Sequence, residues 1–484
     1  AIHLIGHKLA ERSAGHSPTL FDRRRWSNTL LDWCIKDETF KVQLFRFIDV
    51  LPSLRTDDQI AQLAGEYFSK ETLAGPIQWG LRAISATKLG SRLSAKSLRQ
   101  QVSQMAKTFI AGTTIGEALP ALRGLWTEGR SFSVDLLGEA TVSEKEADQY
   151  RDRCLEALAV LEKGTATWPA APLPEQDHFG SVPRVHLSVK LSALYSQLDP
   201  IDPESSFRAV SSRLRPILDR ALSLPAAITF DMEQAELKDL TLMIFMRLLA
   251  EDQYRSYPHV GIAIQAYLTE SADDLDKLLH WVRQRGAPIT IRLVKGAYWD
   301  SDMIRYQQRG WPVPVFRSKP ETDVNYEALS RRLIEQADLI RPAFGTHNLR
   351  SLAHAEATAQ AAGLPSHAYE YQMIFGMAEP LQEAVAATGR RVRMYTPVGE
   401  FIPGMAYLVR RLLENTSNES FLRKEYAESV PLDLLLAPPH ILTRSPAGSG
   451  GPRPQGTDCV RPGQARLDEA FVNEPHTDFS KAPA

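Results

Sequence analysis

Eight short β-rich apolar runs alternate with longer amphipathic stretches between residues 131 and 396, and this alternation constrains the fold more than any other feature of the chain. The longer stretches carry apolar residues at helical spacing. Strands that alternate with helices imply parallel βαβ units, and eight such units predict an α/β fold, a (βα)8 TIM-like barrel. The runs are 131–137, 185–191, 227–233, 260–267, 288–297, 341–346, 367–374 and 391–396.

A doubly wound open sheet is the rival fold for the same pattern. Such a sheet usually holds its cofactor with a glycine-rich first turn. The sequence contains neither a GxGxxG nor a GxxxxGK[ST] segment, so neither a dinucleotide fingerprint nor a P-loop is present. The closed barrel is therefore the favoured prediction.

Three regions of the 484-residue chain differ in composition and in the spacing of their apolar residues. Residues 1–130 read as helices and predict an all-helical arm or accessory domain ahead of the barrel. Residues 131–436 would form the barrel domain. Residues 437–484 contain a Gly- and Pro-rich segment, typical of a linker or tail.

Composition excludes several classes of protein. The net charge of −2 gives no electrostatic footprint for nucleic acid. Three cysteines lie far apart without a CxxC pair, which disfavours a disulfide framework or zinc knuckle and favours a reducing compartment. No apolar run approaches the roughly 18 residues of a membrane span, and no signal peptide opens the sequence. We expect a cytoplasmic protein whose membrane contact, if any, is peripheral.

Charged residues sit at the ends of several apolar runs. Lys190, Asp231, Arg292 and Lys295 each follow or interrupt a Val/Ile/Leu-rich stretch, where a charge is costly unless it is paired. Either these residues form structural ion pairs across the barrel or they line a polar site. Working residues of barrel enzymes lie at the C-terminal ends of the strands, so four such residues favour a site at the barrel mouth.

The helix expected after the eighth run adds a second cluster. Tyr407, Arg410 and Arg411 lie at positions i, i+3 and i+4 and can share a face. Two guanidinium groups there suit a carboxylate or phosphate. The alternative is a surface arginine pair in which Glu414 is the i+4 partner of Arg410. No metal site is predicted, because the sequence has no HExxH segment and no HxH on the first run.

These segments resemble a known family. The runs Arg-Leu-Val-Lys-Gly-Ala-Tyr-Trp-Asp at 292–300, Thr-His-Asn at 346–348 and Ala-Tyr-Leu-Val-Arg-Arg-Leu-Leu-Glu-Asn at 406–415 look like the signatures of proline dehydrogenase. More narrowly, they resemble the proline dehydrogenase domain of the bifunctional flavoenzyme proline utilization A. The resemblance extends from about residue 109 to 436. Residues 471–480 resemble the lead-in to that family's aldehyde dehydrogenase half, which does not follow in this sequence.

The resemblance implies an activity and its partners. It implies a noncovalent FAD, L-proline as hydride donor, 1-pyrroline-5-carboxylate as product and a membrane quinone as final electron acceptor. Peripheral contact with the inner membrane, a homo-oligomer and an aldehyde dehydrogenase half in a longer parent chain are compatible with it. A departure from some members is Ile374-Phe375, where those members carry Leu-His.

The resemblance also assigns residues, one by one. The FAD-binding set is Gln265, Arg292, Val294, Lys295, Gly296, Ala297, Trp299, Lys319, Thr346, His347, Asn348, Gln372 and Glu414. The substrate-binding set is Lys190, Asp231, Ala297, Tyr298, Ile374, Tyr395, Tyr407, Arg410 and Arg411. Within it, the catalytic residues are Lys190, Asp231, Tyr298, Arg410 and Arg411.

Two other hypotheses remain from the residues alone. Lys190 and Lys295 at barrel strand ends would suit a Schiff-base aldolase. The helical first third would suit a non-enzymatic interaction scaffold.

Overall fold

The computed structural model describes residues 1–14, 38–50, 53–54, 56–67, 109–138, 140–400 and 430–439. Within them lies a closed barrel of eight strands, all parallel to their neighbours, as predicted. Its strand order is β1-β10-β9-β8-β7-β6-β5-β4. The strands are β1 (Ser131–Leu136), β4 (His186–Val189), β5 (Ala227–Phe230), β6 (Val260–Gln265), β7 (Thr290–Val294), β8 (Arg341–Gly345), β9 (Glu370–Ile374) and β10 (Arg391–Val398).

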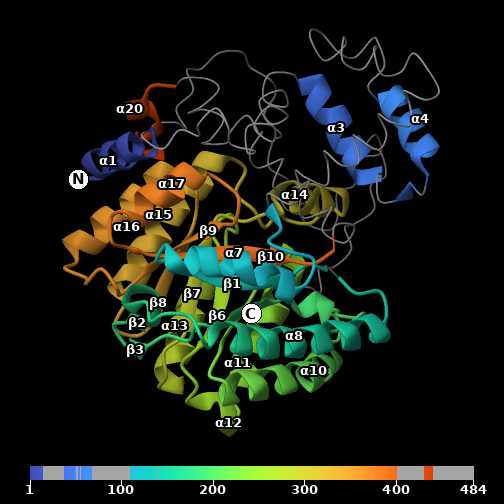
Figure 1. Cartoon of the computed structure of the whole chain (residues 1–484), viewed down its shortest axis with the longest axis horizontal. Helices are drawn as coiled ribbons and strands as arrows, with labels where there is room; N and C mark the ends of the chain where they lie inside the picture. The colour runs from blue at the N-terminus through green and yellow to red at the C-terminus, as the bar shows by residue number, and fades with distance from the viewer. Residues whose placement is uncertain are drawn as a thin grey trace, which may run out of the picture.

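Helices connect the strands on the outside of the barrel (Figure 1). They are α8 (Glu144–Thr165), α10 (Pro203–Ser223), α11 (Lys238–Leu249), α12 (Asp252–Arg255), α13 (Ser271–Arg285), α14 (Trp299–Gln308), α15 (Lys319–Glu335), α16 (Leu349–Ala361) and α17 (Glu379–Ala386). A short helix α9 (Pro172–Glu175) leads into an antiparallel hairpin, β2 (Gln176–Asp177) and β3 (Gly180–Ser181), between α8 and β4. The 3-10 turns η2 (Leu191–Ala193) and η3 (Ala235–Leu237) follow β4 and β5.

The helix ends follow local sequence signals. Ser143 caps α8 by accepting a hydrogen bond from the Glu146 amide, and Asn348 caps α16 in the same way through Ser351. Ser318 and Glu321 form a reciprocal capping box at α15. Gly286 ends α13 at φ 77°, a left-handed conformation that costs glycine little.

Side chains in the barrel alternate between two environments. Leu187, Val189, Ile228 and Phe230 are fully buried in the hydrophobic core between strands and helices. The residues between them bond across the barrel: Arg292 Nη2 donates to Ser188 Oγ at 3.0 Å, although β7 and β4 are not neighbours. A barrel interior is ordinarily filled by branched apolar residues. Here the interior is polar, and the apolar residues of the same strands pack outward.

The described residues ahead of β1 are largely helical. They contain α1 (Ile2–Ala14), α3 (Glu38–Val50), α4 (Asp57–Tyr67) and α7 (Ile115–Thr127). Helix α7 packs against β1, β10 and α8 and buries Leu122, Leu125 and Trp126. Helix α1 packs against α16 and α17, next to a short helix α20 (Leu432–Leu435). Among the described helices, none is long and apolar enough to cross a membrane.

Candidate active site

A buried charge cluster lies at the C-terminal end of the barrel strands. Lys190 directly follows β4, Asp231 follows β5, and Asp135 belongs to β1. The Lys190 ammonium bonds the Asp135 carboxylate and lies 3.6 Å from Asp231 Oδ2. All three are at least nine-tenths buried, with Asp135 only 1% exposed. The lysine therefore lies between two carboxylates rather than with Asp231 alone.

Arg292 and Tyr395 complete this cluster from β7 and β10. Arg292 Nη1 donates to Asp231 Oδ1 at 2.6 Å, and its Nε donates to Gln372 Oε1 at 2.6 Å. The Tyr395 hydroxyl donates to Asp231 Oδ2 at 2.7 Å, and the Arg292 guanidinium lies 5.2 Å from the Tyr395 ring centroid. We call Asp135, Lys190, Asp231, Arg292 and Tyr395 the mouth cluster.

The charges of the mouth cluster determine the protonation state of Lys190. Burial acts to lower the pKa of Lys190, but Asp135, the Tyr395 hydroxyl and Asp231 together raise that pKa well above its ordinary value. Lys190 is therefore a permanent cation at neutral pH. Burial raises the pKa of Asp135, and Lys190 opposes that rise.

Next to the mouth cluster are two polar groups from β6 and the loop after β5. Gln265 Nε2 donates to the Glu233 carbonyl at 3.2 Å, while its Oε1 is a buried acceptor without a partner among the described residues. Glu233 accepts hydrogen bonds from the Ser192 amide at 3.1 Å and hydroxyl at 2.5 Å. Burial raises the pKa of Glu233.

The segment after β7 turns sharply toward α14. Gly296 has φ 126°, and a Cβ at this position would lie 2.0 Å from the Tyr267 ring, so the turn requires glycine. Trp299 Nε1 donates to the Phe316 carbonyl at 2.7 Å. The remaining predicted residues here are Val294, the last residue of β7, then Ala297, and Tyr298 at the N-cap of α14.

Lys295 does not join the mouth cluster. Its ammonium bonds Asp323 on α15 and lies 5.6 Å from the Tyr326 ring centroid. Lys319, also predicted to contact the cofactor, is the first residue of α15. The two lysines thus belong to the loop–α15 edge of the mouth.

The residues after β8 form the turn that leads into α16, and one of them contacts the end of β9. Thr346 Oγ1 accepts from the Asn348 amide at 3.0 Å. His347 Nε2 accepts from the Ile374 amide at 3.0 Å, so Nε2 carries no proton in this arrangement. The structure therefore brings Ile374, another predicted substrate contact, beside His347. The predicted residues Tyr407, Arg410, Arg411 and Glu414 lie outside the described residues.

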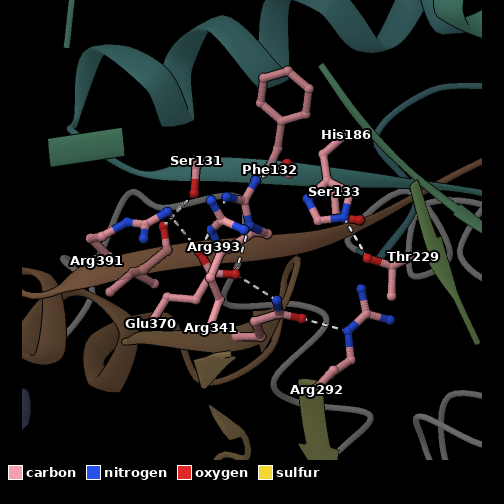
Figure 2. Close-up of polar contacts among 12 residues, drawn as sticks. Ser131, Phe132, Ser133, His186, Thr229, Arg292, Arg341, Glu370, Arg391 and Arg393 are labelled. Atoms are coloured by element: carbon pink, nitrogen blue, oxygen red, sulfur yellow. Dashed lines mark hydrogen bonds and ion pairs between the residues drawn. The ribbon is translucent and has the colours of Figure 1, made fainter. Parts of the chain in front are cut away.

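Sequence reasoning named Gln372 and Asp231, which bond Arg292, but missed the charged residues that lie behind Gln372 in the barrel interior. Glu370, the first residue of β9, accepts from Gln372 Nε2 at 2.6 Å. It also accepts from Arg393 Nε at 2.8 Å, and Figure 2 shows Glu370 and Arg393 beside each other. A hydrogen-bonded chain therefore runs from Glu370 through Gln372 and Arg292 to Asp231 along the barrel interior. Asp135 was missed as well. Its signal was a charge inside the run 131–137, on the same strand face as Ser131 and Ser133.

A sequence model of proline dehydrogenase matches residues 118–424, and a model of the proline utilization A N-terminal domain matches residues 1–109. The chain belongs to the proline dehydrogenase family. The mouth cluster is therefore a feature of a proline dehydrogenase barrel. The barrel strands and all described members of the predicted site lie within the matched segment.

Relatives cover the chain to different extents. Bifunctional protein PutA of Klebsiella aerogenes is 33% identical over 359 residues, which are 73% of this chain and 26% of that protein. Proline dehydrogenase 1 of Bacillus subtilis is 28% identical over 319 residues, which are 66% of this chain and 89% of that protein. The crystal structure of PutA from Bdellovibrio bacteriovorus, inactivated by N-propargylglycine, is 39% identical with a TM-score of 0.85, covering 99% of this chain and 46% of its own. The chain thus spans about a quarter of the length of its bifunctional relative from Klebsiella.

Proposed function

We propose that this chain is a flavin-dependent proline dehydrogenase that oxidises L-proline to 1-pyrroline-5-carboxylate in proline catabolism. The observation that carries the proposal is the mouth cluster: a charged lysine and an arginine, buried with two carboxylates at the catalytic end of a barrel of this family. Buried cations at a ligand site suit an anionic substrate group such as a carboxylate.

The residues present fit a noncovalent FAD. Gln265 offers a buried acceptor without a partner among the described residues, suited to a ring N–H group. Arg292 offers a fixed cation, suited to the negative charge of a reduced ring. Bound at this mouth, FAD would supply the hydride acceptor, at flavin N5. The proposed contacts are Gln265, Arg292, Val294, Lys295, Gly296, Ala297, Trp299, Lys319, Thr346, His347, Asn348, Gln372 and Glu414.

The substrate side of the proposal gives each charged group one task. Lys190, together with Arg410 and Arg411, binds the proline carboxylate. Asp135 and Asp231 keep Lys190 charged and limit its rotation. Orientation of this kind lowers the barrier by holding the reacting atoms in a near-attack arrangement.

The remaining substrate contacts are apolar or aromatic. Tyr298, Tyr395 and Tyr407 pack the pyrrolidine ring, with Ala297 and Ile374 at its edge. In this scheme the hydride leaves C5 of proline, and no strong general base is required when the amine arrives neutral. Lys190 is unsuited to be that base because its pKa is raised.

The aldolase hypothesis is disfavoured by the same electrostatics. A Schiff-base lysine must lose its proton to attack a carbonyl, so such enzymes lower the lysine pKa. The two carboxylates around Lys190 have the opposite effect. Lys295 is engaged in an ion pair with Asp323 of α15 instead of pointing into the mouth cluster.

The wider assignments rest on the family. We propose that electrons pass to a membrane quinone, that the protein is cytoplasmic with peripheral contact at the inner membrane, and that it self-associates. We also propose residues 1–130 as a helical accessory domain, 131–436 as the catalytic barrel and 437–484 as a linker toward an aldehyde dehydrogenase half in a longer parent chain.

The deciding experiment is the visible spectrum of the purified protein before and after anaerobic addition of L-proline. We expect flavin absorption that bleaches with L-proline, and loss of activity with N-propargylglycine, which shares a secondary amine and a carboxylate with proline. A colourless protein that FAD cannot reconstitute, or flavin bands that proline leaves unchanged, would refute the proposal. A covalent adduct trapped by borohydride would favour the aldolase instead.

A further inference from the structure

The two ends of the described chain meet on the outside of the barrel, where α1 lies beside α20 (Figure 1). His3 and His7 are one helical turn apart on α1, and Asp433 belongs to α20. Asp433 Oδ1 lies 2.9 Å from His7 Nε2 and 3.5 Å from His3 Nδ1. The Asp433 carboxylate of α20 thus faces the imidazoles of His3 and His7 on α1.

Packing holds these two helices together independently of the three polar side chains. A Cβ at Gly6 would lie 2.4 Å from Leu436 Cδ2, so the Leu436 side chain packs directly against the backbone of α1 and would have to shift for a larger residue at position 6. The Leu436 carbonyl accepts from Arg350 Nη1 of α16 at 2.5 Å. Helix α1 also packs against α16 and α17. The side chains of His3, His7 and Asp433 are therefore brought together by a scaffold that does not depend on them.

The three side chains match the donor set of a transition-metal ion. Their ligand atoms all lie within 4.8 Å of one another. Zn²⁺ binds imidazole nitrogen and carboxylate oxygen at about 2.0–2.2 Å, so tetrahedral ligands lie roughly 3.3–3.6 Å apart. The two measured separations, 2.9 and 3.5 Å, require only small side-chain rotations to reach that spacing.

We propose that His3, His7 and Asp433 form a binding site for a divalent transition-metal ion such as Zn²⁺, which ties α1 to α20. The side chains are 52%, 41% and 74% exposed, so water completes the coordination and the ion exchanges with solvent. The role is structural, because the ligands come from the helical surface and none belongs to the mouth cluster. Sequence spacing could show only the His pair, since Asp433 lies 426 residues beyond His7.

Zinc titration by isothermal calorimetry tests the site. We expect one binding event in the full chain that weakens about tenfold or more in His7→Ala and in Asp433→Asn, because each removes one of three protein ligands. His280→Ala is the matched control, since His280 is also exposed on a helix, where it contacts only Gln284 among its described hydrogen-bond partners. Acidification should weaken binding in the wild type, because protons compete for the imidazoles.

A second measurement separates this site from zinc bound elsewhere. Zinc should slow amide hydrogen exchange in residues 2–14 of the wild type and of His280→Ala, but not of His7→Ala. Turnover should be the same in all four proteins. The proposal is overturned if His7→Ala and Asp433→Asn bind zinc as tightly as the wild type, or if zinc leaves exchange in α1 unchanged.

Discussion

The two ends of the barrel both bury charges, but they use them differently. The mouth cluster at the C-terminal end pairs two cations with two carboxylates. At the N-terminal end, Glu370 accepts hydrogen bonds from Arg391, Arg393 and Gln372, with both carboxylate oxygens engaged. Asp177, carried in by the β2–β3 hairpin, pairs with Arg341 at 2.5 Å. We call Asp177, Arg341, Glu370, Arg391 and Arg393 the floor cluster.

The pKa values of one carboxyl group from each cluster shift in opposite directions. Burial acts to raise the pKa of Glu370, but Arg393 and Arg391 lower it well below its ordinary range. Burial instead raises the pKa of Asp135 at the mouth. Among the described residues, Asp135 Oδ2 and Gln265 Oε1 at the mouth are buried acceptors without a partner, whereas the atom without a partner in the floor cluster is a donor, Arg391 Nε.

The floor is therefore arranged for stability and the mouth for a ligand. Both carboxylate oxygens of Glu370 already accept hydrogen bonds from the protein, so Glu370 needs no donor from a substrate. Acceptors without a partner cost free energy unless a ligand supplies donors. Substitutions at the two ends should therefore separate unfolding from catalysis.

The largest expected effect is on stability, from Glu370→Gln. The variant keeps an acceptor for Gln372 but leaves Arg391 and Arg393 without their shared counter-charge. Breaking a buried ion pair costs about 3–5 kcal/mol, which lowers the midpoint of thermal unfolding by roughly 6–20 °C. Calorimetry measures this midpoint, and Glu156→Gln on the exposed face of α8 is the control. A large loss of turnover with an unchanged midpoint would contradict the assignment of the floor.

The pH dependence sharpens the same prediction. The pKa of Glu370 is depressed on folding, so its contribution to stability is present above its ordinary value of 4.5 and is lost as the pH falls toward the lower folded value. The difference in midpoint between wild type and Glu370→Gln should therefore shrink below about pH 4.5. A difference that stays constant down to the acid transition would show that charge is not the cause.

The next effect is on catalysis, from Asp231→Asn at the mouth. The amide keeps the shape of the side chain but removes the charge that Arg292 and Lys190 share. Hydrogen bonds to charged groups contribute about 1.5–3 kcal/mol, so kcat/KM for proline should fall roughly 10- to 150-fold. Steady-state kinetics with a dye acceptor measure it, with exposed Asp273→Asn as the control. Unchanged efficiency would make Asp231 a structural ion-pair residue, as at the floor.

The fold could be predicted because all of its signals are local. Seven of the eight runs contain one barrel strand each, and the eighth, 391–396, lies within β10, since β-rich segments separated by amphipathic helices have few other arrangements. Run ends were less accurate: the run 288–297 extends past β7, which stops at Val294, just before the turn at Gly296. The polar interior was not predicted, because the runs look apolar when both faces of a strand are read together.

The site could be predicted only in part, and strand alternation explains why. Arg292 faces the interior, so Lys295, three residues later, has the opposite parity and reaches Asp323 on α15 instead. The sequence alone could therefore have predicted that Lys295 does not join the mouth cluster. The contact between Asp135 and Lys190 could not be predicted, because it depends on closure of the barrel, which pairs β1 with β4. Glu370 likewise meets Arg393 through the register of β9 and β10.

The smallest expected effect is from Tyr395→Phe. The variant removes the hydroxyl that donates to Asp231 Oδ2 but leaves the ring against Arg292, and Asp231 keeps Arg292 and Lys190 as partners. A single hydrogen bond whose acceptor keeps other partners is worth about 1 kcal/mol, so kcat/KM for proline should fall roughly fivefold. The fall should lie in kcat rather than KM if the hydroxyl acts by orienting Asp231, whereas both should stay unchanged if the tyrosine only packs the ring, because phenylalanine keeps that ring. The unfolding midpoint should move by far less than in Glu370→Gln. If Tyr395→Phe destabilised the protein as much as Glu370→Gln, the hydrogen-bonded chain from Glu370 to Asp231 would couple mouth and floor in stability, and the division between them would be wrong.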